Sequence, residues 1–115
     1  MHELSIAMSI VEMAAEESAQ RGGTRVHAVH LKLGQLSGVV GAALRSAFEL
    51  ARESESALAA AELRIEEIPV TVHCPGCDGE RTACFPELRC RECGEVAAEV
   101  LRGRELEVAA LEIES

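Results

Sequence analysis

Residues 74–94 read CPGCDGERTACFPELRCRECG, and this stretch decides how the chain is organised. It contains two Cys-x-x-Cys pairs with twelve residues between them, Cys74–Cys77 and Cys90–Cys93. Two intervening residues let both thiolates of a pair turn toward one cation, and Gly76 and Gly94 permit tight turns whose backbone N–H groups face the sulfurs. Two such pairs facing each other form a closed tetrahedral site, which predicts an ion with a structural role.

Three interpretations of the paired cysteines are open at this stage. Two disulfides fit poorly, because five cysteines are an odd number and a cytosol keeps thiols reduced. Iron in a rubredoxin-like site would use the same four ligands. The spacing resembles a zinc ribbon, and zinc is the usual ion of so compact a site. We therefore favour a structural Zn(II) held by Cys74, Cys77, Cys90 and Cys93.

Two further residues of this segment have chemistry of their own. Cys84 lies midway between the pairs, and we interpret it as a small residue at the ribbon tip rather than as a redox or metal group. His73 directly precedes Cys74. We interpret it as a solvated strand residue, with metal ligation or a hydrogen bond to the site as the alternative.

Outward from the cysteines, apolar residues follow helical and strand periods. An apolar stripe predicts a helix over 4–19, which Gly22 and Gly23 end. The residues of this stripe, the last two widening it, are Leu4, Met8, Val11, Ala15, Ile10 and Ala14. A second stripe predicts a helix over 40–51, with Ser37 as a candidate cap. Period-two alternation predicts strands over 26–33, 63–72 and 106–113.

These elements predict an α+β fold, with two helices packed on a three-stranded sheet and an inserted zinc-ribbon domain. The expected domains are 1–69 together with 104–115, and the ribbon at 70–103. So small a ribbon buries too little apolar surface to fold alone, so its ion would contribute folding free energy. The alternation over 26–33 places His27 on the inward side and His30 on the solvent side.

Composition excludes several classes of function. The chain has 11 Lys+Arg and 20 Asp+Glu, and a formal net charge of −9 repels nucleic acid and anionic membranes. Aromatic residues make up 2% of the chain, which leaves no platform for base stacking. No Ser/His/Asp order, phosphate-binding glycine loop or GxxxxGK[ST] motif is present in the sequence, so we expect a protein that is not an enzyme.

The start of the chain also bears on its compartment. The first residues, MHEL, lack the basic segment of a signal peptide. No apolar run approaches the roughly 20 residues that a membrane helix needs. We therefore expect a cytoplasmic protein.

The N-terminal dipeptide offers three nitrogen donors in chelating order: the α-amine of Met1, the amide nitrogen of His2 and the imidazole Nδ1 of His2. Nitrogen donors in one plane suit a square-planar Ni(II) or Cu(II) ion. Because the amide must lose its proton, binding should depend strongly on pH. The fourth donor would be the Glu3 carboxylate, water, or another histidine such as His27 or His30.

Five motifs occur in a fixed order along nearly the whole chain. They are MHELS at 1–5, LGQLSGV at 33–39, AFEL at 47–50, AELRIEEIP at 61–69 and the two cysteine pairs. This set resembles the HypA/HybF family, whose members are nickel metallochaperones for hydrogenase maturation. One departure is that Gly41 and Ala42 open the second helix, where the family often has Pro and acidic residues.

The resemblance implies two metals with different roles. It implies transient nickel at the Met1 α-amine and His2, with Glu3 assisting, and structural zinc at the cysteine pairs. It also implies delivery of Ni(II) to the hydrogenase large subunit during [NiFe]-hydrogenase maturation, together with a HypB-type GTPase. In some organisms the family serves urease maturation proteins as well. We expect a monomer or a homodimer.

Two competing functions belong to other classes. A zinc-ribbon interaction adaptor without nickel function would use the cysteine site alone. A rubredoxin-like electron carrier would hold iron and be red, which visible absorption would reveal.

Overall fold

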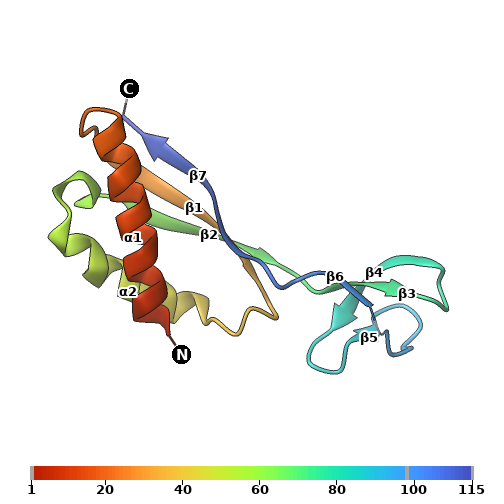
Figure 1. The fold of residues 1–115 in the computed structure, drawn as a ribbon. Coiled ribbons are helices and arrows are strands. Elements are labelled where there is room, and N and C mark those ends of the chain that lie inside the picture. Colours follow the sequence, from red (N-terminus) through yellow and green to blue (C-terminus); the bar gives the residue numbers. More distant parts are fainter. Residues whose placement is uncertain (1, 98, 115) are drawn as a thin grey trace. The chain divides into compact units, whose positions relative to one another are not determined.

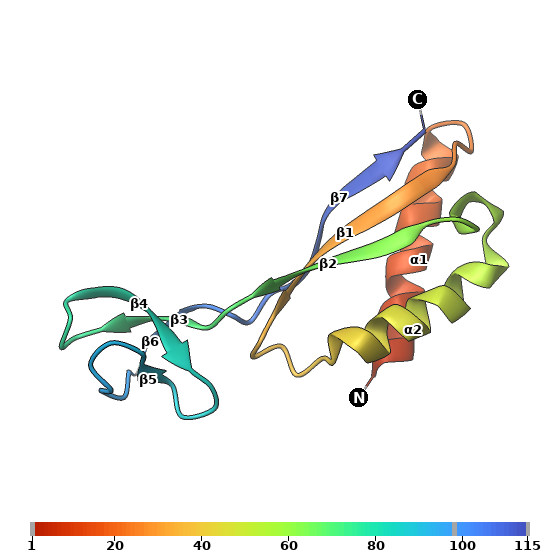
Figure 2. The same cartoon turned by 180° about the vertical axis from the view of Figure 1, so that it is seen from behind.

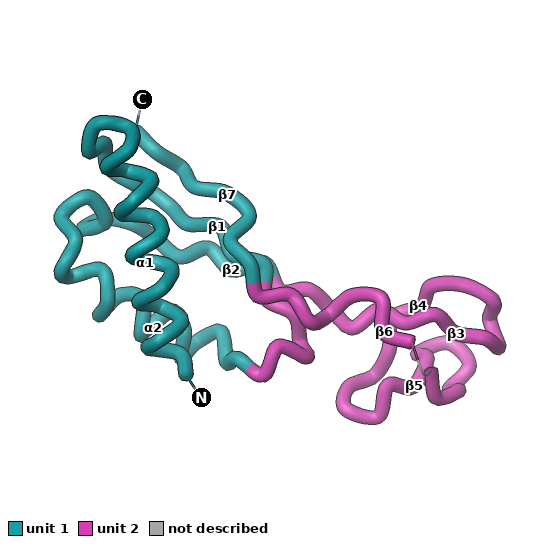
Figure 3. The backbone as a smooth tube through the Cα atoms, viewed as in Figure 1, with its two compact units in different colours: residues 1–32, 39–66, 107–115 teal, residues 33–38, 67–106 magenta. Residues whose placement is uncertain are grey.

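The computed structural model describes residues 2–97 and 99–114, which form two compact units (Figure 3). Unit 1 comprises residues 1–32, 39–66 and 107–115, and unit 2 comprises 33–38 and 67–106. The division into a nickel-binding domain and a zinc-ribbon domain, with boundaries at residues 69/70 and 103/104, stays a prediction. None of the helices in the described residues is long and apolar enough to cross a bilayer.

Unit 1 is an α+β layer, as predicted. A three-stranded sheet has the order β2-β1-β7, and helices α1 and α2 cover one of its faces (Figures 1 and 2). Short 3-10 turns follow α2. The elements are α1 (Glu3–Gln20), β1 (Val26–Gly34), α2 (Gly41–Ala51), η1 (Arg52–Ser54), η2 (Ser56–Leu58), β2 (Glu62–Ile68) and β7 (Leu106–Ile113).

Helix α1 ends where the glycine pair predicts. Gly22 and Gly23 have φ angles of +85° and +80°, a region that costs glycine little. The N–H of Gly23 donates to the Ser18 carbonyl at 2.8 Å, and that of Gly22 to Ala19 at 3.2 Å. This pair of bonds is a Schellman motif, which satisfies the last carbonyls of the helix.

The buried side of α1 differs from the predicted stripe. Its buried residues are Ala7, Ile10, Val11, Ala14 and Ser18. Leu4 and Met8 instead have exposed fractions of 48% and 52%. These α1 residues share one core with Phe48 and Leu44 of α2, and Leu4 and Met8 are not part of it.

Two smaller expectations about unit 1 are also wrong. The His27 side chain is 51% exposed and pairs with Glu114, because the strand's burial changes step and Ala28 and Val29 are both buried. Helix α2 is capped at Val40 rather than at Ser37. A β-branched apolar side chain cannot accept a hydrogen bond, so this helix start needs a partner from elsewhere in the fold.

Unit 2 is a four-stranded sheet with the order β5-β4-β3-β6. The segment 63–72, expected as one strand, is divided here because Pro69 lacks a backbone N–H and β2 ends before it. The core of unit 2 is small: the buried residues of its apolar cluster are Val70, Val72, Ala83 and Ala97. The strands are β3 (Thr71–Cys74), β4 (Gly79–Cys84), β5 (Arg89–Cys90) and β6 (Glu99–Arg102).

The loop after β1 is built into unit 2. Gln35 accepts a hydrogen bond at its side-chain oxygen from the Val70 N–H at 3.0 Å. The Leu36 N–H donates to the Gly103 carbonyl at 2.6 Å, and the Leu36 side chain packs against the unit's apolar core. Backbone and side-chain contacts therefore tie this distant loop to the ribbon.

Gly34, at the end of β1, has no room for a side chain. A Cβ at this position would lie 2.1 Å from the Gly103 carbonyl oxygen and 2.7 Å from the Arg104 nitrogen. Both are backbone atoms and cannot turn away as a flexible side chain can. Gly34 thus permits the close approach of the two chain segments.

We expect Gly34→Ala to lower the free energy of unfolding by about 2 kcal/mol or more, because backbone must move to admit the methyl group. Gly38→Ala is the matched control. Gly38 has φ +80° and open space around its Cβ position, so only the backbone strain of about 1 kcal/mol is expected. Urea denaturation of the two metal-loaded variants measures the difference. An equal loss in both would show that the approach at Gly34 is not tight.

Candidate metal sites

Four cysteines converge in unit 2. Their Sγ atoms all lie within 4.8 Å of one another, and no other His/Cys/Asp/Glu group of three or more in residues 2–97 and 99–114 meets this geometry. In each pair the first cysteine is the last residue of a strand, β3 or β5, and the second lies in the turn that follows. The cysteines of the cluster are Cys74, Cys77, Cys90 and Cys93.

The sulfur separations suit a tetrahedral ion. With Zn–S bonds of about 2.3 Å, the edges of a sulfur tetrahedron measure about 3.8 Å. The Sγ atoms of Cys74 and Cys93 are 3.4 Å apart, and those of Cys77 and Cys90 are 3.8 Å apart. The free cysteines form no disulfide in this arrangement. The donor set therefore fits a four-coordinate thiophilic metal.

The environment gives the thiols very different acidities. Burial and hydrogen bonds with the other thiols raise the pKa of Cys77 to about 12. The backbone amide of Cys93, with that of Glu92 in support, lowers the pKa of Cys90 to about 7. The Glu92 N–H lies 3.4 Å from the Cys90 sulfur. Backbone amides aimed at sulfur spread thiolate charge, as expected from the sequence for turns of this kind.

The two turns use different residues for their tight geometry. Gly94 adopts φ +78°, but in the first turn the left-handed residue is Asp78, at φ +52°. Gly76 is not among the glycines with positive φ, so the expectation that it supplies the backbone freedom of the first turn is wrong. A Cβ at Gly76 would lie 2.5 Å from the Glu95 carboxylate, the end of a flexible side chain that can move away.

Cys84 and His73 lie outside the four-sulfur cluster. Cys84 is the last residue of β4 and is partly buried. His73 is in β3, opposite Glu80 of β4 and Glu99 of β6. Flanking carboxylates on both neighbouring strands make His73 a strand residue in a polar ladder.

The second predicted site lies at the start of α1. Met1 lies outside the described residues, so its α-amine has no structural description here. His2 is exposed and is the N-cap of α1, and its carbonyl accepts the first helical bond from Ile6 at 3.0 Å. The first N–H groups of an α-helix have no intrahelical acceptor. The backbone N–H of His2 therefore makes no hydrogen bond within α1.

Glu3 links the two helices. Its Oε2 accepts a hydrogen bond from the backbone N–H of Val40, the N-cap of α2, at 3.2 Å. In a capping box this N–H is satisfied by a Glu three residues further along the same helix. Here the carboxylate comes from α1, and it compensates for the weak Val40–Gly41 start. No local sequence pattern predicts this bond, because the partners are 37 residues apart.

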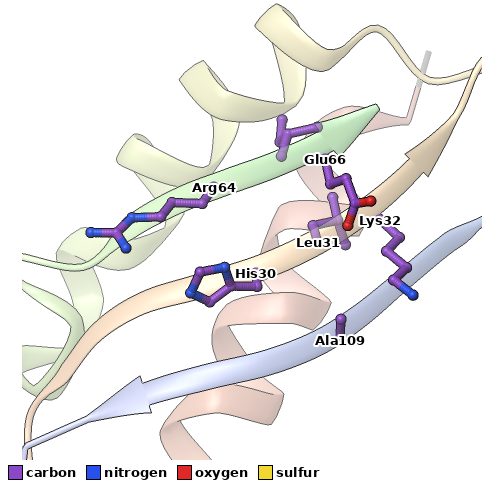
Figure 4. Close-up of a pocket in the computed structure, with 7 residues that line it drawn as sticks. His30, Leu31, Lys32, Arg64, Glu66 and Ala109 are labelled. Atoms are coloured by element: carbon purple, nitrogen blue, oxygen red, sulfur yellow. The ribbon is translucent and has the colours of Figure 1, made fainter. Parts of the chain in front are cut away.

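His27 and His30 lie on strand β1, and they pair with one carboxylate of β7 and one just after its end. His27 Nε2 is 3.4 Å from Glu114, and His30 Nε2 is 2.6 Å from Glu112. Figure 4 shows His30 beside Arg64 on the sheet face away from the helices. The hydrogen bond from His30, helped by Arg64, holds the pKa of Glu112 below its usual range. Strand β1 begins beside the last turn of α1, at the end of the helix away from its start (Figure 1).

Comparison with known proteins gives one family across the chain. The family model described as "Hydrogenase/urease nickel incorporation, metallochaperone, hypA" matches residues 1–113. A hydrogenase maturation factor HypA from Chloroflexus aurantiacus is 50% identical over 113 residues, covering 97% of this chain and 98% of the relative. One from Roseiflexus sp. is 46% identical, covering 99% and 93%.

Two solved structures have the same fold. The solution structure of the Ni metallochaperone HypA from Helicobacter pylori superposes with a TM-score of 0.66 at 24% identity, covering 98% of this chain and 97% of that one. A second, titled as the solution structure of HypA protein, has a TM-score of 0.71 at 23% identity, covering 99% and 97%.

Metal binding to the cysteines should release protons. At pH 8, Zn(II) binding to metal-free protein is expected to release about two protons or more, because Cys77 and Cys93 are protonated thiols in its absence. Cys90, with a pKa of about 7, is mostly thiolate and contributes little. Affinity accordingly falls as pH falls. Calorimetry in buffers of different ionisation enthalpy counts the protons. Cys84→Ser should leave the count unchanged, and an unchanged count in Cys77→Ser would contradict the assignment.

Removing the Glu3 carboxylate should loosen the start of α2. Glu3→Ala is expected to speed hydrogen exchange of the Val40 amide and to cost about 1 kcal/mol, as for a lost helix cap. Glu3→Gln keeps an oxygen acceptor and should retain much of the protection. Glu12→Ala, also on α1, serves as control. Equal Val40 exchange in Glu3→Ala and wild type would show that the bond does not hold the helix.

Proposed function

The chain belongs to the HypA family of hydrogenase and urease nickel-incorporation metallochaperones, and from this premise we propose that it binds Ni(II) at its N-terminus and delivers it to the large subunit of a [NiFe]-hydrogenase. The family consists of maturation factors rather than enzymes. Nickel is the cargo, so it must be released as well as bound. The proposal concerns the ligands, the client and the partners.

The observation that carries the proposal is the exposure of His2 at the start of α1. The proposed donors are the Met1 α-amine, the His2 amide nitrogen and the His2 imidazole, with Glu3 assisting. The amide is free to lose its proton because α1 does not use it as a helical donor. A terminal, solvent-facing chelate leaves the axial directions of a square-planar ion open to ligands of a client protein.

The cysteine cluster supports a separate, resident metal. We propose that Zn(II) is held by Cys74, Cys77, Cys90 and Cys93, which fit its size and donor preference. A closed four-thiolate site has no open coordination position, so its contribution is structural. The few buried apolar residues of unit 2 are consistent with a unit whose folding depends on the ion.

The proposed partners follow from the family and not from a contact in the structure. They are a HypB-type GTPase, which supplies the nucleotide hydrolysis this sequence has no motif for, and the hydrogenase large subunit. The family description also names urease, so urease maturation proteins are a second proposed client group. We propose a cytoplasmic protein that acts as a monomer or a homodimer.

Metal titration tests this function. We expect the untagged protein to bind about one Zn(II) tightly and about one Ni(II) exchangeably. His2→Ala, or extra residues placed before Met1, should abolish nickel binding and leave zinc in place. His27→Ala, an exposed histidine elsewhere in unit 1, is the matched control and should bind nickel normally.

Three outcomes would contradict the proposal. Nickel binding that survives both His2→Ala and the N-terminal extension would move the site elsewhere. A protein with zinc but no nickel affinity would favour the alternative of a zinc-ribbon interaction adaptor. Visible absorption by bound iron would indicate that the four cysteines form a rubredoxin-like iron centre and not a zinc site.

A further inference from the structure

A groove lies between helices α1 and α2 of unit 1. It encloses about 360 Å³ and is lined by residues of α1, the end of α2 and the turn that follows. Three large apolar side chains in its lining are exposed: Leu4 by 48%, Met8 by 52% and Leu50 by 59%. These are the apolar residues of the predicted α1 stripe that the core does not use, together with one from α2.

This exposure is concentrated rather than scattered. Leu4 and Met8 are four residues apart, so they lie on one side of α1, one turn from each other. Leu50 meets them from α2, and α1 and α2 lie side by side on the sheet (Figures 1 and 2). Grouped apolar side chains in a groove are typical of a surface that another chain covers. The groove between two neighbouring helices has a shape into which a third helix can pack.

The charges at the groove have one sign. Glu12, Glu53 and Glu55 are part of its lining, and no Lys or Arg is among the lining residues described. The two arginines of this region point elsewhere: Arg45 and Arg52 line a different hollow, and Arg52 donates to the Ala61 carbonyl. The groove thus combines an apolar floor with an uncompensated acidic rim.

From this combination we propose that the groove binds a basic amphipathic helix of a partner protein. Apolar residues of that helix at i, i+4 and i+7 would enter between Leu4, Met8 and Leu50, and its Lys or Arg side chains would meet the three carboxylates. The unbranched, flexible side chain of Met8 adapts to such an occupant.

A second copy of this chain does not match the groove. The chain has a formal net charge of −9, and α1 contains no Lys or Arg over its whole length. Helix α2 contains one basic residue, Arg45. Neither helix of this chain is therefore a basic amphipathic helix, and the charges of two copies would repel at this surface.

One end of the groove lies close in sequence to the proposed nickel ligands. Leu4 is two residues from His2, so one end of a bound helix would lie at the start of α1. Docking there would bring the partner next to the N-terminal chelate, and this last step rests on the proposed nickel function. The docking itself needs no nickel.

A designed peptide tests the docking. The probe is a fluorescent helical peptide of about 18 residues with Leu at i, i+4 and i+7 and Lys elsewhere on its exposed sides. A second peptide has the same Leu pattern with Glu in place of Lys. Fluorescence anisotropy with the zinc-loaded, nickel-free full chain gives both dissociation constants. We expect the basic peptide to bind at least roughly tenfold more tightly.

Variants locate the binding. Glu53→Lys with Glu55→Lys should weaken the basic peptide by roughly tenfold or more, as should Met8→Gln with Leu50→Gln. The control, Glu66→Lys with Glu107→Lys, makes the same change of charge on exposed residues outside the groove and should alter binding less than about twofold. Five of the six positions are exposed and Glu55 is partly buried, and circular dichroism checks that each variant is folded.

Three results would overturn the proposal. Equal weakening by the groove and control charge changes would mean diffuse attraction to an acidic protein. Equal dissociation constants for the basic and the acidic peptide would mean that the three carboxylates do not favour a basic partner. A dimer in sedimentation that Met8→Gln with Leu50→Gln dissociates would make a second copy the occupant.

The docking and the nickel function can fail separately. His2→Ala should bind the basic peptide like the wild type, and the Met8/Leu50 variant should bind nickel normally. Loss of peptide binding with intact nickel binding removes the docking proposal alone. Loss of nickel binding with intact peptide binding removes the proposed function alone.

Discussion

The convergence of four sulfur atoms within 4.8 Å is the constraint on which unit 2 depends. The strands around them are two to six residues long, and the described apolar core cluster has four buried members. So little apolar burial cannot offset the conformational entropy of ordering the unit. The turns that carry the cysteines are accordingly built for the site, with Asp78 and Gly94 in left-handed conformations and backbone amides facing sulfur.

Unit 1 depends on apolar packing and not on a metal site. Its stability comes from one apolar layer between two helices and a sheet, whose largest fully buried side chains are Phe48, Leu31, Leu44 and Leu58. The face of the sheet away from the helices has paired charges, such as His30 with Glu112. At an exposure of 37% and 46% these pairs contribute little to stability, so that face is a solvated surface.

Much of this arrangement was predictable, because it rests on local signals. Period 3.6, period 2, glycine stops and the cysteine spacing each depend on a few neighbouring residues, and they predict both helices, the three-stranded sheet and the inserted ribbon. The four-sulfur cluster was predictable for the same reason. What failed depends on tertiary context. Whether Leu4 faces core or solvent depends on which other side chains fill the core, and the N–H at the start of α2 is bound by Glu3 from another helix.

The loop after β1 has a consequence for how this architecture can change in evolution. The ribbon is not a cassette held by two adjacent chain ends, because Gln35 and Leu36 supply part of its backbone bonding and apolar core from elsewhere in the sequence. A contiguous copy of residues 67–106 moved into another protein would arrive without them. Exchange of the ribbon between proteins by simple insertion is thus disfavoured, and the two units are expected to be inherited together.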